Sequence, residues 1–366
     1  MNDAYLILEN GTVFKGRAFG YETQTVGELV FTTSMTGYLE TLADPGYYGQ
    51  IVLQTFPLIG NYGVIPPEFG IGPAHLRAYI VRDWCQEPSN FRSEGNLDSF
   101  LRKIKVPGLY DIDTRALTRL LRENGVMNAM ISKTPELSEE QWAKLREYRI
   151  TDAVSSTCSA NAECRMQSAK TSSIQSDIEC EIGDKSSKFN IAVWDFGNSG
   201  KLTDMLLARG ATPYIVDFTA SADDLLAQNP DGVALSCGPG DPSENTRIIE
   251  EIKNLCDKNI PIFGVGLGHQ MLAIAHGAKT IKLPFGHRGA NQPVSELATN
   301  HVFATSQNHG YAVAPDSLPD ATRMIYSNTN DGTCEGIEYT NIPAFSVQFD
   351  PTDEIFSKFF AHIKTN

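Results

Sequence analysis

The segment Gly264–Gln270 has residue types and a spacing that could carry nucleophilic catalysis. It reads Gly-Val-Gly-Leu-Gly-His-Gln and follows an apolar stretch. In a nucleophile elbow, two glycines flank a central residue and let the backbone turn sharply between a strand and a helix. Here the central residue is Gly266, which has no side chain. Two interpretations stay open at this point: a catalytic bend without its nucleophile, and a glycine-rich turn without chemistry. A dinucleotide-binding loop is excluded, because its third glycine would fall at His269.

A second glycine-rich turn follows another apolar stretch at Leu235–Pro242. Gly238 and Gly240 flank Pro239 there. Backbone N–H groups at such a turn could stabilise an oxyanion, although a tight turn without chemistry fits equally well.

Three further segments carry polar residues that could line a site. Gln307–Tyr311 follows a predicted strand and is either a pocket wall or a turn. Thr33–Tyr38 is a polar loop, for which a turn is the favoured interpretation. Gly197–Lys201 suggests a phosphate loop, but Leu202 stands where a serine or threonine should bind magnesium, so this function is excluded.

The elements that would position these loops alternate between strand and helix from Phe189 onward. Short apolar strands and amphipathic helices in alternation predict a parallel sheet covered on both faces, with ligands at the carboxyl ends of the strands. The expected strands cover residues 191–196, 213–216, 233–235, 262–265 and 302–305; the expected helices cover 202–208, a short helix capped by Ser221, a helix from Ser243 to about Cys256, and one from about His269.

The first half of the chain is predicted to be β-rich. A hairpin is expected around Asn10-Gly11, with further strands at residues 29–31 and 51–53 and a helix over 113–124 that ends at Gly125. Residues 153–188 are rich in serine, threonine and alanine and are interpreted as a linker. The chain therefore divides into a first domain (1–152), a linker (153–188) and a second domain (189–366), and the fold class is α/β.

Composition restricts the function further. The 366 residues have a formal net charge of -14, and such an acidic surface disfavours nucleic-acid binding. We expect no membrane segment, because no apolar run approaches the roughly 18 residues that a spanning helix needs. The seven cysteines show no metal-ligand spacing, so we expect no metal site and a cytoplasmic protein with reduced thiols.

Taken together and in order, these segments resemble the small, glutamine-hydrolysing subunit of carbamoyl phosphate synthetase along nearly the whole chain. The resemblance implies a β-rich small-subunit domain followed by a flavodoxin-like class I glutamine amidotransferase domain. The first domain matches through Leu8–Gly11, Thr33–Tyr38 and Asp113–Arg119; the second matches through Asp195–Gly197, Gly238–Pro242, Gly268–Gln270, Phe285–His287 and Gln307–Gly310.

In that family a cysteine at the elbow attacks glutamine, a histidine transfers protons and a glutamate orients the histidine. The resemblance places these three roles at Gly266, Asp350 and Thr352, so all three side chains differ. The asparagine that the family has before Gly-Pro-Gly is Cys237 here, and the loop after Gly197 also departs from the family pattern. Thr352 is better interpreted as the N-cap of the last helix.

The residues that would bind glutamine are present. The resemblance places the substrate against seven residues and assigns the oxyanion hole to the backbone N–H groups of Gly238 and Leu267. The seven are Ser34, Gly238, Gly240, Gln270, Asn308, Gly310 and Tyr311.

These features predict a small subunit that has lost its own glutamine hydrolysis. It would pair with the large synthetase subunit, which binds ATP and magnesium, and support ammonia-dependent synthesis of carbamoyl phosphate for pyrimidine and arginine biosynthesis. This chain itself would need no cofactor. The alternatives are a glutamine-binding sensor or scaffold and an active glutaminase that uses Cys237 as a relocated nucleophile. Restoring the triad with Gly266→Cys, Asp350→His and Thr352→Glu is expected to restore glutaminase activity if the pocket is intact.

Overall fold

The computed structural model describes residues 3–66, 73–158 and 189–365, in two compact units. The first unit comprises residues 1–151 together with 283–291, and the second comprises residues 152–282 and 292–366. Each unit has hydrophobic clusters of its own.

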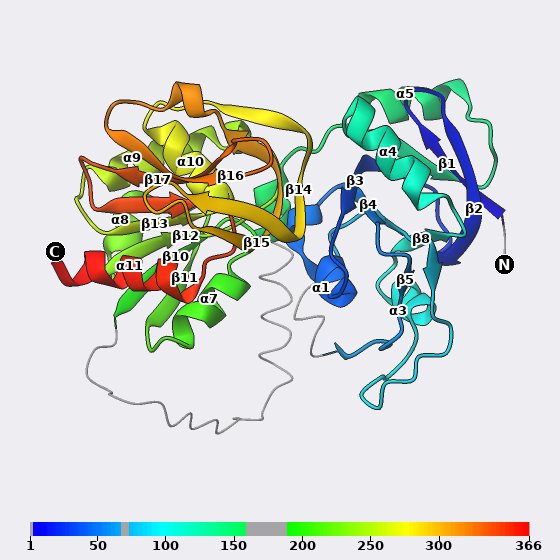
Figure 1. Ribbon diagram of the computed structural model, residues 1–366, viewed down its shortest axis with the longest axis horizontal. Helices are drawn as coiled ribbons and strands as arrows, with labels where there is room; N and C mark the ends of the chain where they lie inside the picture. Colours follow the sequence, from blue (N-terminus) through cyan, green and yellow to red (C-terminus); the bar gives the residue numbers. More distant parts are fainter. Residues whose placement is uncertain (1–2, 67–72, 159–188, 366) are drawn as a thin grey trace. The chain divides into compact units, whose positions relative to one another are not determined.

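A closed barrel forms the first unit, with strand order β1-β2-β8-β6-β4-β3-β9 (Figure 1). The predicted hairpin is present: β1 and β2 pair antiparallel, and Gly11 between them adopts a φ of 88°. The strands of this unit are β1 (Asp3–Leu8), β2 (Val13–Gly20), β3 (Thr25–Thr32), β4 (Gln50–Gln54), β6 (Ala78–Ile80), β8 (Pro107–Tyr110) and β9 (Met127–Ser132), with a separate pair of β5 (Leu58–Ile59) and β7 (Asp83–Trp84).

Short helices accompany the barrel. The predicted helix is α4 (Thr114–Asn124), which Asp113 caps by accepting a hydrogen bond from the Ala116 N–H. Leu117 and Leu121 are buried on one face of α4, which explains its amphipathic pattern. The other helices of this unit are α1 (Tyr38–Ala43), the 3₁₀ turn η1 (Pro45–Tyr47), α3 (Leu97–Lys103) and α5 (Glu139–Glu147).

A nine-stranded sheet forms the second unit, in the order β11-β10-β12-β13-β18-β17-β15-β14-β16. The first five strands of that order run parallel, and β17 pairs antiparallel with β18. Their bounds are β10 (Asn190–Asp195), β11 (Thr212–Asp217), β12 (Gly232–Leu235), β13 (Ile262–Val265), β14 (Thr280–Glu296), β15 (Val302–Val313), β16 (Thr322–Asn328), β17 (Cys334–Tyr339) and β18 (Ala344–Val347).

Helices cover both faces of the parallel part of this sheet (Figure 1). Along β10, Ala192 and Trp194 pack in the cluster with α8, α9 and α10, whereas Ile191 and Val193 pack in the cluster with α7 and α11. This alternation is the period of two that a strand buried on both faces requires. The elements are α7 (Gly200–Leu207), α8 (Ala222–Leu226), α9 (Thr246–Cys256), α10 (Leu267–Ala275) and α11 (Asp353–Thr365), with the 3₁₀ turns η2 (Pro242–Glu244) and η3 (Pro315–Ser317).

The structure differs from the sequence predictions at four places. Residues 153–158 of the expected linker are helical, and Thr157 is fully buried; residues 159–188 lie outside the described residues. Ser243 lies in η2, and Asn245 is the N-cap residue of α9. The helix expected from about His269 begins at Leu267. Gln307–Tyr311 lies inside β15 and is not a loop after it.

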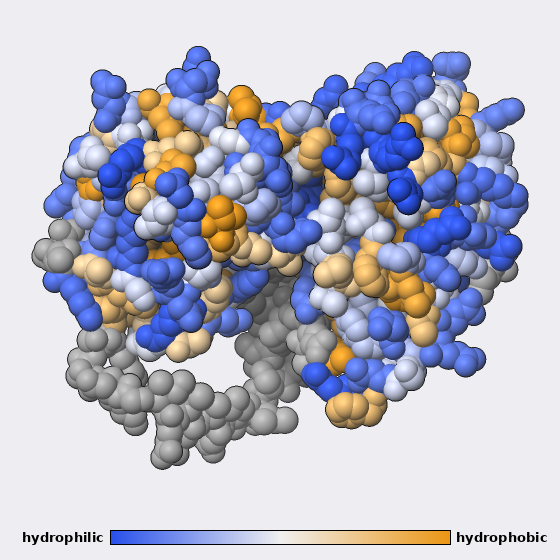
Figure 2. Space-filling view, in the orientation of Figure 1, coloured by the Kyte–Doolittle hydropathy of each residue, from blue (hydrophilic) through white to orange (hydrophobic). Residues whose placement is uncertain are grey.

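The described surface carries scattered apolar side chains. Phe91, Met35 and Leu207 are among the exposed large hydrophobic residues. On the face seen in Figure 2, hydrophobic residues form small groups among hydrophilic ones. Within the described part of the chain, no helix is both long enough and apolar enough to cross a membrane.

Candidate functional site

The elbow joins β13 to α10, as the glycine spacing predicted. Gly266 adopts φ 57° and ψ -111°, a backbone conformation that side-chain-bearing residues rarely adopt. Its N–H donates to the Val347 carbonyl oxygen at 2.9 Å, which anchors the turn to β18. The sharp strand-to-helix turn of a nucleophile elbow is therefore retained.

The flanking glycines allow α10 to approach the sheet closely. A β-carbon at position 268 would lie 2.5 Å from the Leu235 carbonyl oxygen, and one at position 264 would lie 3.0 Å from the Gly268 carbonyl oxygen. The Gly268 N–H also donates to the Ser236 carbonyl oxygen at 3.1 Å. Any larger residue at 264 or 268 would push the helix away from the sheet.

Cys237 fills the space beside Gly266. A β-carbon at position 266 would lie 2.0 Å from the Cys237 Sγ, although 3.5 Å from its Cβ. The two residues lie at the ends of neighbouring parallel strands, since β12 pairs with β13. A nucleophile relocated to Cys237 is one of the alternatives to lost hydrolysis, and the structure places the Cys237 sulfur beside the elbow.

The Gly238–Gly240 turn lies against the elbow, as a shared site requires. A β-carbon at 238 would lie 2.1 Å from the Phe196 carbonyl oxygen and 2.8 Å from the Leu267 Cδ2, so the two residues assigned to the oxyanion hole are neighbours. Gly240 has a φ of 91°, and a β-carbon there would lie 2.7 Å from the Ala153 Cβ. Both positions accept only glycine for steric reasons.

Two of the predicted glutamine-binding residues bond directly to each other. Gln270 is 3% exposed, and its Nε2 donates to the Tyr311 carbonyl oxygen at 2.6 Å and to the Gln348 Oε1 at 2.8 Å. Asn308 and Gly310 lie on β15, in the same strand as Tyr311. The structure thus connects α10, β15 and the segment after β18 through one side-chain amide.

A buried polar network continues from Tyr311 into the sheet. His309 places Nδ1 2.7 Å from the Tyr311 carbonyl oxygen and Nε2 3.0 Å from the Gln307 Oε1. Both ring nitrogens of His309 therefore lie within hydrogen-bond distance of an oxygen atom. The Gln307 Nε2 donates to the carboxylate of fully buried Glu335 at 3.0 Å, so the network extends to an acidic side chain.

Glu335 was missed by the sequence analysis. Its carboxylate also accepts hydrogen bonds from Asn328 Nδ2 and Thr333 Oγ1, each at 3.3 Å. A glutamate between Cys334 and Gly336 gives no motif, and only the completed sheet shows that the carboxylate is buried.

The positions assigned to the catalytic histidine and glutamate carry other interactions. Asp350 forms an ion pair with Lys201 of α7, with Nζ and Oδ2 2.5 Å apart. Thr352 directly precedes α11, and its carbonyl oxygen accepts from the Phe356 N–H at 3.2 Å. Neither side chain is an imidazole, so the histidine's proton transfer has no counterpart at these two positions.

Ser34 is the one predicted glutamine-binding residue in the first unit. It follows β3, where the Thr32 hydroxyl donates to its Oγ at 3.3 Å. The neighbouring Thr33 N–H donates to the Arg288 carbonyl oxygen at 3.1 Å, so residues 283–291 pack against this loop within the same unit.

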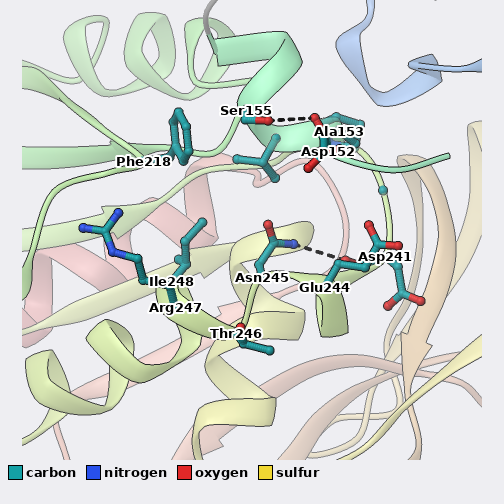
Figure 3. Close-up of a pocket in the computed structure, with 13 residues that line it drawn as sticks. Asp152, Ala153, Ser155, Phe218, Asp241, Glu244, Asn245, Thr246, Arg247 and Ile248 are labelled. Atoms are coloured by element: carbon teal, nitrogen blue, oxygen red, sulfur yellow. Dashed lines mark hydrogen bonds between the residues drawn. The ribbon is translucent and has the colours of Figure 1, made fainter.

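A cavity of about 230 Å³ adjoins the Gly238–Gly240 turn (Figure 3). Of the predicted glutamine-binding residues, only Gly240 lines it. Phe218, Arg247 and three carboxylates also contribute to its wall. Burial raises the pKa of Glu244, and the nearby charges of Asp241 and Asp152 raise it further. The cavity is therefore distinct in its lining from the predicted glutamine site.

Two family models match the chain on either side of residues 159–188. Residues 6–131 match the carbamoyl-phosphate synthase small chain, CPSase domain, and residues 192–354 match the class-I glutamine amidotransferase. The Clostridium perfringens carbamoyl phosphate synthase small chain is 44% identical over 348 residues, covering 95% of this chain and 93% of that protein. The Vibrio vulnificus small chain is 42% identical over 352 residues, covering 95% and 92%. A glutamine amidotransferase structure from Thermotoga maritima covers 49% of this chain and 84% of its own, with 17% identity and a TM-score of 0.37.

The elbow, the parallel sheet and the second family match define a protein with a class I glutamine amidotransferase domain. Since the first domain matches as well and relatives aligned over 95% or more of the chain are 40–44% identical, the chain belongs to the carbamoyl phosphate synthase small-chain family.

Proposed function

We propose that this small chain no longer hydrolyses glutamine and supports synthesis of carbamoyl phosphate from ammonia on a large synthetase subunit. The observation that carries the proposal is the elbow itself: Gly266 holds the geometry of a nucleophile elbow without offering a nucleophile. Hydrolysis through an acyl-enzyme needs an activated nucleophile with a base beside it. In another triad hydrolase, removing all three members costs about a million-fold in turnover.

The partner and cofactors of this proposal follow from the resemblance. The large subunit would hold ATP and magnesium, and the two chains would form a heterodimer in the cytoplasm that serves pyrimidine and arginine biosynthesis. The extent of the match supports a conserved partner, since relatives named as small chains align over nearly their whole length.

The experiment compares nitrogen sources in the complex of this chain with its large subunit. Ammonium is expected to support carbamoyl phosphate synthesis, whereas glutamine is not, and no glutamate is released from glutamine. Synthesis with ammonium serves as the internal control that the complex is competent. Glutamate release at rates that match synthesis would contradict the proposal.

A relocated nucleophile at Cys237 is disfavoured, although its sulfur lies at the elbow. A thiol with the reference pKa of about 8.5 is mostly protonated at neutral pH and needs a base. The base position holds Asp350, which is paired with Lys201. Incubation with a glutamine-like chloroketone followed by peptide mapping distinguishes the two: we expect no adduct at Cys237, and a stoichiometric adduct there would support the active glutaminase.

Glutamine binding without turnover is a second candidate, favoured by the Gln270–Tyr311 hydrogen bond between two of the residues that the resemblance assigns to glutamine. Such a chain would act as a glutamine sensor or scaffold. Calorimetric titration with glutamine, with and without the large subunit, tests this function. No heat of binding at millimolar glutamine would exclude it.

A further inference from the structure

The elbow is occupied from the neighbouring strand. The Cys237 Sγ lies 2.0 Å from the place where a side chain at 266 would begin. Optimal contacts between non-bonded heavy atoms are about 3.5–4.0 Å, so a β-carbon and this sulfur cannot coexist as placed. The thiol therefore takes the volume that belongs to the elbow side chain.

We propose that Cys237 enforces glycine at position 266, so that the catalytic elbow cannot regain a side chain until the Cys237 thiol is removed. The inference extends the proposed loss of hydrolysis, but it concerns packing and is tested without measuring hydrolysis. Position 237 thereby becomes a residue that determines whether this small chain can carry a nucleophile.

Backbone conformation alone does not explain the glycine. A positive φ costs a residue with a side chain on the order of 1–3 kcal/mol. Nucleophile elbows nevertheless hold serine in a sharp, strained turn. The close approach of Cys237 is thus the feature that separates this elbow from one that can hold a nucleophile.

The backbone at Cys237 is fixed by several contacts and cannot withdraw the side chain. The Cys237 carbonyl oxygen accepts from the Asn198 N–H at 3.1 Å and from the Ser236 hydroxyl at 2.9 Å. The adjoining Gly238 is confined by the Phe196 carbonyl oxygen. Rotation about the Cα–Cβ bond is the remaining way to move the sulfur, which packs against an apolar cluster of the sheet.

A double-mutant cycle on the full chain tests the proposal. Thermal unfolding is measured for Gly266→Ala, Cys237→Ala and the double variant. The strain of a positive φ is the same in both backgrounds and cancels, whereas the steric contact exists only with the thiol. We expect Gly266→Ala to lower Tm by several degrees more in the natural background than in the Cys237→Ala background.

Gly277→Ala is the matched control. Gly277 also has a positive φ, 99°, but a β-carbon there would meet no atom within 4 Å. Its loss of Tm should be the same with and without Cys237→Ala. Gly266→Ala alone could fail to fold. If adding Cys237→Ala then restored folding, this rescue would support the proposal.

Equal losses for Gly266→Ala in the two backgrounds would overturn it. The proposal would also be overturned if Gly266→Ala failed to fold in both backgrounds while Gly277→Ala folded. The backbone conformation at position 266 would then be what requires glycine. Neither result depends on whether the unmodified chain releases glutamate, so the two proposals fail separately.

Discussion

The elbow and the β15 network lie in the same unit but have changed to different extents. The resemblance assigns the nucleophile, the base and the orienting group to Gly266, Asp350 and Thr352, of which Gly266 lies at the elbow. In the network, Gln270 still bonds to the strand that carries His309 and Tyr311. The resemblance thus assigns no reactive side chain to the elbow, whereas the residues around it hydrogen-bond to one another.

A physical reason lies in the cost of leaving buried polar groups without partners. Each unsatisfied buried donor or acceptor costs about 1–3 kcal/mol, so substitutions within such a network destabilise the fold. The elbow positions are different: Lys201 and Asp350 form an exposed pair, and Gly266 is packed by a thiol. The side chains at positions 266 and 350 therefore leave no buried polar atom without a partner.

Rebuilding the elbow should have the largest effect. From the sequence alone, the three changes Gly266→Cys, Asp350→His and Thr352→Glu were expected to restore activity. The structure revises this expectation: we expect them to fail while the Cys237 thiol occupies the elbow. Adding Cys237→Ala should raise glutamate release on the order of a hundred-fold over the unmodified chain, because an activated nucleophile supplies much of a triad's roughly million-fold contribution. Coupled detection of glutamate measures this.

Two controls keep that result interpretable. Cys237→Ala alone should release no more glutamate than the unmodified chain. Full activity of the three-change variant would show that the thiol swings aside. An inactive four-change variant with normal stability would show that the glutamine framework, too, has changed.

Removing Glu335 should have the next largest effect. Glu335→Leu removes the acceptor of the Asn328 amide and one of two acceptors each for Gln307 and Thr333, so we expect a loss of about 2–4 kcal/mol in the free energy of unfolding. Urea denaturation measures the loss. Glu250→Leu on the exposed side of α9 is the control and should change stability by less than about 0.5 kcal/mol. Equal effects of the two substitutions would mean that the network does not stabilise the fold.

Much of the second unit could be predicted from sequence because its signals are local. β10, β12 and β13 are apolar runs that end at glycine-containing turns: the Gly197 loop, the Gly238–Gly240 segment and the elbow. β15 was predicted too short, because its second half carries the polar residues of the buried network and lacks an apolar pattern. Polarity in a strand marks a loop only when the side chains face solvent.

The rest depended on tertiary contacts. The Cys237–Gly266 contact joins residues from two strands and depends on a side-chain torsion, which no spacing rule contains. Residues 153–158 have the composition of a linker, yet the Cys158 Sγ donates to the Asp195 carbonyl oxygen at 3.3 Å. Small and hydroxylated residues suit close packing against a glycine-rich loop as well as they suit a linker.

His269 offers the smallest and most specific test of the framework beside the elbow. Its Nδ1 lies 2.8 Å from the Ser346 Oγ, and complete burial lowers its pKa to about 3. The unfolded chain takes up a proton at this histidine below about pH 6.5, whereas the folded chain does not. Stability from this group is therefore complete above pH 6.5 and is lost as the pH falls, by up to about 1.4 kcal/mol per pH unit.

His269→Asn should make the decline in stability from pH 7 to pH 5 shallower. The slope should fall by up to the contribution of one bound proton, about 1.4 kcal/mol per pH unit. Burial also lowers the pKa of His276 and His362, so part of the slope remains. Urea denaturation at several pH values measures the slope, and the exposed His301→Asn variant is the control. If His269→Asn kept the full slope, the imidazole would take up its proton in the folded chain, and the framework beside the elbow would be open to water. The contrast between a changed elbow and a preserved framework would then lose its structural basis.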